Sequence, residues 1–140
     1  MSQKIATAIL VLQALGPLIS HAQRPAKAVF DTTVCRIAAH PERFSGKQVR
    51  VRASVLSDGL ERTVLVDPGC RFGIVPQIST EIRGRPDIQA FEDAIFGQNP
   101  GTSKKRIAGV FTGVVSWRSK VASLQIQEIT DLEVSPLKKP

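Results

Sequence analysis

Alternating apolar and polar residues predict a β-hairpin in the first half of the chain. Four apolar residues alternate with polar or charged ones over residues 48–56: Val49, Val51, Ala53 and Val55. A period of two is typical of a strand that buries one face. The turn pair Asp58-Gly59 follows, and then comes the strand-like run 62–66, which is apolar from Val64 onward. We therefore expect two antiparallel strands joined by a tight turn.

Three further strands are predicted downstream of this hairpin. Residues 72–75 form a short apolar run, which Pro76 either ends or confines to the edge of a sheet. The runs 106–117 and 121–134 carry longer strand patterns. Within the first of these, two glycines are expected to relax or bulge the strand: Gly109 and Gly113.

Two helices are predicted around the strands. Residues 34–40 place apolar side chains on one helical face, behind the possible N-cap residues 31–33, and Pro41 stops or kinks this helix. Residues 88–96 also have one apolar face, and Pro86 stands in the first turn. The order is then helix, three strands, helix and two strands, which is that of the OB-fold. We expect a mainly β domain over 33–135: a five-stranded OB-like barrel with an N-terminal helix and one helix between strands 3 and 4.

The first 22 residues have the pattern of a secretory signal peptide. Lys4 supplies a positive charge, residues 5–19 are mostly apolar, and small residues precede a cleavage point after Ala22. A membrane anchor is the alternative, but a span needs about 20 apolar residues and Gly16-Pro17 interrupts this run. We expect a signal peptide at 1–22, a linker at 23–32, a tail at 136–140, a periplasmic or secreted location, and no stable membrane insertion after leader removal.

The charge of the chain is positive. Its 140 residues carry a net charge of +7, which becomes about +6 when Lys4 leaves with the leader. Such a charge favours loose contact with polyanions, and it also simply keeps a small domain soluble. Hydrophobic residues make up 42% of the chain and charged residues 22%, as in globular proteins.

The two cysteines, Cys35 and Cys70, predict a disulfide. An exported chain with one pair in an oxidising space usually joins them. Closing a loop of about 36 residues stabilises a fold by roughly 3 to 4 kcal/mol. The spacing fits neither a Cys-x-x-Cys redox motif nor a four-ligand zinc site. A catalytic pair of Cys35 with His40 is a weaker alternative, and His40 is more simply a helix-end residue.

Part of the chain also resembles a known family. Cys35 lies in a helical segment, Pro41, Phe44 and Gly46-Lys47 lead into the first strand, and Asp67-Pro68 precedes Cys70. In these features residues 33–78 resemble a functionally uncharacterised family of small exported bacterial proteins with an OB-like barrel. Phe44 and Ala53 stand where that family has Tyr and Gly, and residues 71–75 are an unusual third strand. The resemblance implies the fold and export, and it supplies no catalytic residues.

Basic residues suggest one candidate binding surface. A possible anion-binding face comprises Arg50, Arg52, Arg62, Lys104, Lys105 and Arg106. Binding of single-stranded nucleic acid would also require exposed aromatic residues on the central strands. Only Phe72 and Trp117 are expected to be exposed, since Phe91, Phe96 and Phe111 are expected in the core and helix seam. Nucleic acid is therefore not the expected partner, and polyanion or nucleic-acid binding through the basic face is the alternative function.

No catalytic constellation stands out in the sequence. The carboxylates of Asp58, Glu61 and Asp67 could hold a divalent ion only if their loops converged, and residues 97–105 lack the spacing of a phosphate-binding loop. We expect neither cofactor nor metal. The favoured function is that of an exported non-enzymatic binding module, whose partner is an envelope protein, a peptide or an anionic glycan.

Overall fold

The computed structural model describes residues 16, 27–58, 62–97 and 105–136. Most of the predicted signal peptide, residues 23–26 of the predicted linker and residues 137–140 of the predicted tail lie outside these ranges. Among the described residues, no helix has the length and apolar character needed to cross a bilayer.

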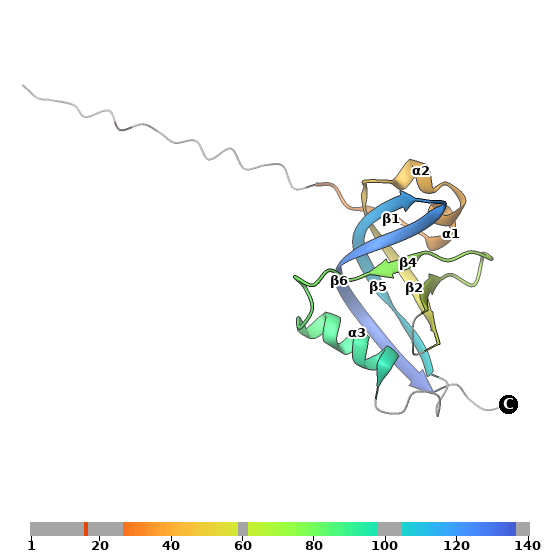
Figure 1. The fold of residues 1–140 in the computed structure, drawn as a ribbon, viewed down its shortest axis with the longest axis vertical. Helices are drawn as coiled ribbons and strands as arrows, with labels where there is room; N and C mark the ends of the chain where they lie inside the picture. Colours follow the sequence, from red (N-terminus) through yellow and green to blue (C-terminus); the bar gives the residue numbers. More distant parts are fainter. Residues whose placement is uncertain (1–15, 17–26, 59–61, 98–104, 137–140) are drawn as a thin grey trace, which may run out of the picture.

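The described chain is mainly β, with six strands and three helices (Figure 1). The strands are β1 Phe30–Thr32, β2 Gln48–Ser57, β3 Thr63–Val66, β4 Val75–Gln77, β5 Lys105–Arg118 and β6 Val121–Pro136. The helices are α1 Val34–Ala39, α2 Pro41–Phe44 and α3 Pro86–Phe96. The helix expected between the third and fourth predicted strands is confirmed as α3.

All six strands belong to one mixed sheet. Its hydrogen-bonded order is β1-β2-β5-β6-β4, and β3 pairs with the far end of β2. The pairs β1–β2 and β4–β6 are parallel, and the remaining pairs are antiparallel. The sheet is open, because β3 and the segment before β4 meet only at one bridge between Leu65 and Ile74. Each of these two residues donates its N–H to the carbonyl of the other, at 2.8 and 3.0 Å.

Two predictions of strand position need correction. The predicted third strand, 72–75, is replaced by β4. Ile74 pairs with Leu65 in an isolated bridge, and only the residues after it pair with β6. Pro76 lies inside β4 at the end of the sheet order, so the edge alternative is confirmed. The strand β1, which raises the count from five to six, was not predicted and lies in the expected linker.

The core lies against the inner face of the sheet. The predicted alternation along β2 is confirmed, since Val49, Val51, Ala53 and Val55 are all buried. Helix α1 adds Val34 and Ile37 at one end of the sheet, and α3 adds Ile88 and Phe91 at the other (Figure 1). The rings of Phe91 and Phe111 meet edge to face, with centroids 5.5 Å apart. Phe96, however, is 50% exposed at the end of α3, so its predicted burial is wrong.

The two glycines of β5 allow this long strand to bend. The β5–β6 register shifts between Ala108 and Val110 and again between Thr112 and Gly113, which confirms the predicted irregularity. A Cβ atom on Gly113 would collide with the carbonyl oxygen of Gln125 in β6. Glycine is therefore required here because the two backbones approach too closely for a side chain.

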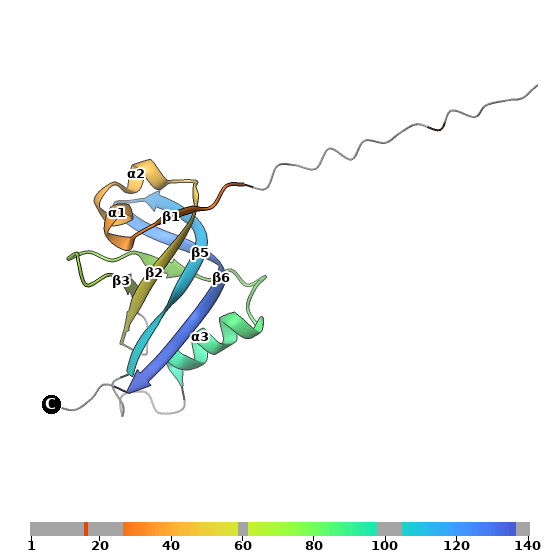
Figure 2. The ribbon, with the colours of Figure 1, turned by 180° about the vertical axis from the view of Figure 1, so that it is seen from behind.

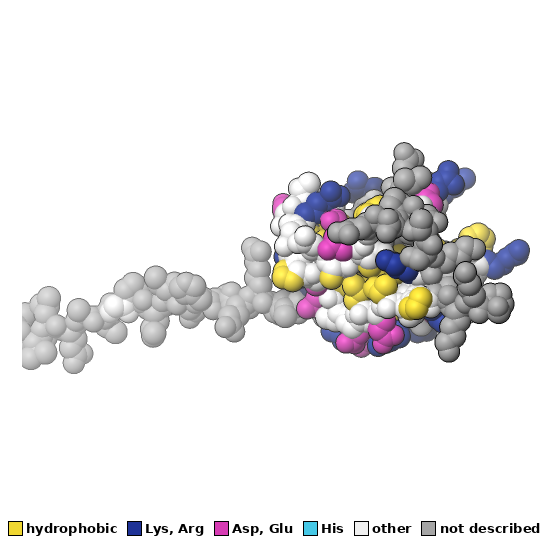
Figure 3. All heavy atoms as spheres, turned by 90° about the horizontal axis from the view of Figure 1, so that it is seen from below, with side chains coloured by type: hydrophobic (Ala, Val, Ile, Leu, Met, Phe, Trp, Pro, Cys, Tyr) yellow, Lys and Arg dark blue, Asp and Glu magenta, His cyan; other side chains and the backbone are white. Residues whose placement is uncertain are grey.

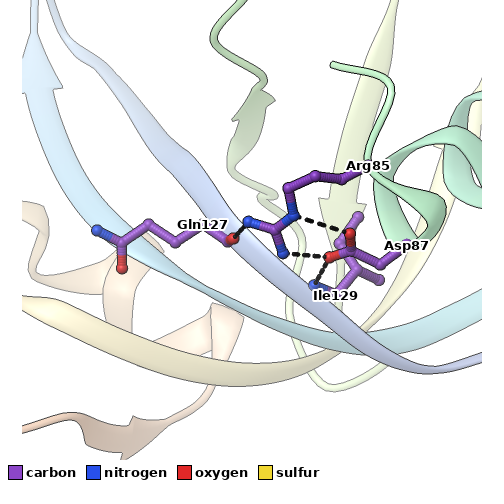
Figure 4. Close-up of polar contacts among 4 residues, drawn as sticks. All are labelled: Arg85, Asp87, Gln127 and Ile129. Atoms are coloured by element: carbon purple, nitrogen blue, oxygen red, sulfur yellow. Dashed lines mark hydrogen bonds and ion pairs between the residues drawn. The ribbon is translucent and has the colours of Figure 1, made fainter. Parts of the chain in front are cut away.

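Helix α3 is fastened to β6 by a polar clamp of Arg85 and Asp87 (Figure 4). Arg85 donates to both carboxylate oxygens of Asp87, at 3.2 and 2.8 Å, and to the carbonyl of Gln127 at 2.8 Å. The N–H of Ile129 donates to Asp87 Oδ2 at 3.1 Å. The clamp thus satisfies backbone groups of β6 while it holds the first turn of α3.

Candidate functional site

The predicted disulfide between Cys35 and Cys70 is present. The Cα atoms of the two residues are 5.4 Å apart, and the bridge joins α1 to the turn that follows β3. In that turn Asp67 accepts a hydrogen bond from the Gly69 N–H at 2.9 Å, as expected for an Asp-Pro-Gly turn. Both sulfurs are engaged, so Cys35 cannot serve as the thiol of a Cys–His pair. His40 lies at the junction of α1 and α2, as a helix-end residue.

The two central residues of the predicted anion-binding face are exposed but engaged with acids. Arg50 and Arg52 point outward from β2, with side chains 51% and 66% exposed. Arg50 pairs with Asp31 at 3.4 Å, and Arg52 pairs with Asp131 at 3.7 Å. Each positive charge therefore has a negative neighbour, which weakens the field that a polyanion would meet.

The other residues of this predicted face lie away from the first two. Val110 of β5 is the register partner of Arg52, so Arg106 lies about 13 Å further along that strand. Lys105 precedes it, Arg62 lies beyond the β2–β3 turn, and Lys104 is outside the described residues. The view from below also shows Asp and Glu side chains close to Lys and Arg around an apolar centre (Figure 3). The five of these basic residues that the structure describes therefore do not form one patch.

A hollow beside β1 gathers a different set of residues, and its volume is about 520 Å³. Strand β1 and the two short helices, which supply its lining, lie close together in Figure 2. Its lining residues are Phe30, Asp31, Thr32, Cys35, Arg36, Ala39, His40, Arg43 and Phe44. We refer to this hollow as the α1–β1 groove.

Local sequence signals build the groove. Thr33 ends β1 and caps α1, because its hydroxyl accepts the Arg36 N–H at 3.2 Å. Pro41, which is favoured in a first helical turn, starts α2 after a kink at His40. Gly46 then adopts a positive φ of 79°, and its N–H donates to the Val115 carbonyl at 2.8 Å. The chain is thereby turned back into β2, and both helices are left beside β1.

The groove presents positive charge and hydrogen-bond donors. Arg36 and Arg43 are exposed, and neither forms an ion pair with any residue that the structure describes. The hydroxyl of Thr32 is buried and has no hydrogen-bond partner within the described part of the chain. The one acid of the lining, Asp31, is already engaged by Arg50. This arrangement is suited to holding an anionic group, since guanidinium groups bind carboxylates and phosphates in a bidentate manner.

Apolar surface lies beside these donors. Phe30 is 49% exposed, and the ammonium of Lys47 stands 5.5 Å from its ring centroid. Phe44 is half-buried and packs against the core. His40 Nδ1 lies 3.9 Å from Glu42 Oε1, which is an ion pair only when the imidazole is protonated. The groove thus combines an aromatic wall with two cations.

Other candidate sites gain no support from the structure. Within the described ranges, no three His, Cys, Asp or Glu residues are placed to hold a metal ion. Glu61 and most of residues 97–105 lie outside those ranges. Phe72 is 74% exposed and Trp117 is 37% exposed, as predicted, but Phe72 lies in a loop and Trp117 near the end of β5, away from Arg50 and Arg52.

Sequence reasoning missed the groove because it missed β1. Phe30, Thr32, Arg36 and Arg43 were not among the candidate site residues. One signal was available: Arg36 and Arg43 stand on either side of the His40-Pro41 kink. Without β1, however, nothing indicated that the two guanidinium groups shared a hollow.

Comparison with known proteins finds no match. No family model, curated protein or solved structure is significantly similar to the chain. The functional inference therefore depends on the residues of the groove.

Proposed function

We propose that the protein is an exported, non-enzymatic binding module on an OB-like barrel, and that its ligand occupies the α1–β1 groove. One observation carries the proposal. The groove collects two exposed guanidinium groups that form no ion pair with a described residue. Because guanidinium groups hold carboxylates and phosphates through paired N–H donors, two of them at one hollow are suited to an anionic ligand.

Strand pairing supports the barrel. The antiparallel β2–β3 and β2–β5 pairs, the parallel β4–β6 pair and the position of α3 agree with OB topology. The Leu65–Ile74 bridge would then be the seam at which the sheet closes. A Cβ atom on Gly73 would collide with Val64 and with the Leu65 carbonyl, so the two segments are already in close contact. Strand β1 is an addition to the five strands of such a barrel.

Export is supported by the disulfide and by the pattern of the first 22 residues. Structural disulfides persist in oxidising compartments and are rare in the cytosol.

The capture of partners from the native envelope tests the proposed site. The Arg36→Glu, Arg43→Glu variant should lose a partner that the wild-type protein retains. The matched control is Arg52→Glu, Arg62→Glu, which makes the same change in net charge on the face predicted from sequence and leaves the Arg50–Asp31 pair intact. We expect the control to retain the partner, as quantified by mass spectrometry of the eluates. Loss of the partner in the control, with retention in the groove variant, would favour polyanion binding through the β2 face and would reject the groove.

A further inference from the structure

We propose that the α1–β1 groove binds an acidic peptide in extended form, which adds as a strand to the free edge of β1. This inference concerns the ligand class and rests on the proposed function, which concerns the site. It depends on the edge of β1, on the two guanidinium groups and on the lining of the groove.

The outer edge of β1 is open to a further strand. This strand pairs with β2 alone, in parallel register from Phe30 opposite Val49 to Thr32 opposite Val51. Within the described part of the chain, the backbone of residues 30–32 makes no hydrogen bond outside that ladder. A strand paired on one side leaves alternate N–H and C=O groups pointing away, and these are a template for another chain.

The groove borders the whole of β1. All three residues of the strand belong to its lining. The groove therefore follows the strand over about 10 Å, which is the length of a three-residue peptide segment.

The positive charge of the groove favours an acidic ligand. Arg36 and Arg43 come from two different helices and line the same hollow, with no ion-pair partner among the described residues. A carboxylate side chain on an added strand would meet these guanidinium groups, and an apolar neighbour would meet the exposed ring of Phe30.

An acidic peptide can contact the β1 edge, the guanidinium groups and the Phe30 ring together, whereas a free anion contacts only the guanidinium groups. Inorganic phosphate would engage the guanidinium groups but would leave the backbone edge of β1 unpaired and the Phe30 ring exposed. A polyanionic glycan would likewise provide no strand of alternating N–H and C=O groups. The edge and the cations together point to a peptide as the occupant.

Titration with defined probes tests the ligand class. The probe is the pentapeptide acetyl-Val-Glu-Val-Asp-Val-amide, and its matched control replaces Glu and Asp by Gln and Asn. We expect the acidic peptide to bind the oxidised protein about tenfold or more tightly than the amide control in calorimetry. The Arg36→Glu, Arg43→Glu variant should lose this preference, whereas Arg52→Glu, Arg62→Glu should keep it. Thermal melts of both variants, whose altered residues are all exposed, check that they remain folded.

Amide hydrogen exchange then separates strand addition from simple anion binding. The acidic peptide should slow exchange at one or more amides of residues 30–32, and inorganic phosphate should not. If phosphate shifts the amide resonances of the groove and neither peptide binds, the peptide proposal is overturned while the groove remains the site. If the peptide perturbs residues 50–52 and leaves 30–44 unchanged, both proposals are overturned.

Discussion

Replacing both cysteines by alanine, Cys35→Ala with Cys70→Ala, is expected to lower the free energy of unfolding by about 4 kcal/mol. The bridge joins residues 35 positions apart, so its loss releases a long loop in the unfolded chain. It also frees α1 from the turn after β3. Because a domain of this size is stable by only about 5–15 kcal/mol, this would be a large share of its stability.

Urea unfolding, followed by far-ultraviolet circular dichroism, measures the effect of the disulfide. Wild-type protein in excess reductant should unfold at nearly the same urea concentration as the double variant. The variant itself should be insensitive to reductant, which serves as the control. A difference in unfolding free energy below about 1 kcal/mol would contradict the structural role given to the bridge.

Asp87→Ala is expected to lower the free energy of unfolding by about 2 to 3 kcal/mol, which is the second largest of the expected effects. The substitution removes the acceptor of the Ile129 N–H and the partner of Arg85, and Ile129 is buried. Asp93→Ala is the matched control, because it removes an exposed carboxylate from the same helix. The control should change the free energy of unfolding by no more than about 0.5 kcal/mol. Equal effects of the two substitutions would rule out the clamp as a source of stability.

Because of this clamp, the free energy of unfolding is expected to depend on pH. Burial raises the pKa of Asp87, but hydrogen bonds from the Ile129 backbone and from Arg85, together with the charge of Arg85, outweigh burial and lower it. The folded protein therefore holds this carboxylate ionised at a pH where the unfolded chain, with a pKa of about 3.9, begins to take up a proton. The stabilisation is complete above pH 4 or so and is lost as the pH falls through the folded pKa.

Asp87→Asn isolates this titration. Asparagine keeps an oxygen for the Ile129 N–H and cannot ionise, so the variant is less stable than wild type at pH 7. The difference in unfolding free energy between the two should shrink as the pH falls below about 4. Urea unfolding at a series of pH values measures it. A difference that stays constant down to about pH 2 would show that Asp87 is not the titrating group.

Much of the fold could be predicted because its signals are local. The alternation over β2, the apolar face of α3 and the glycines of β5 each fix a structural feature from a few neighbouring residues. The disulfide followed from a count of two cysteines and the inferred compartment. These are the features in which the sequence prediction and the structure agree.

The features that were missed depend on long-range pairing. Strand β1 has three residues, too few for a recognisable period, and its partner in β2 begins 19 positions later. The shift of β4 likewise depends on Ile74, which bonds to Leu65 before the chain reaches β6. The groove required β1 and therefore could not be derived. The ion pairs of Arg50 and Arg52 could not be predicted either, because Asp131 is remote in sequence and Asp31 lies on the unpredicted strand.

The central claim is that the α1–β1 groove is the binding site, and residue-resolved amide spectra test it most directly. Isotopically labelled, oxidised protein would be titrated with the partner recovered in the capture experiment. We predict that the largest changes in amide resonance fall in residues 30–44, around Arg36 and Arg43. Changes concentrated instead at residues 50–52 and their neighbours in β5, with 30–44 unaffected, would contradict the claim.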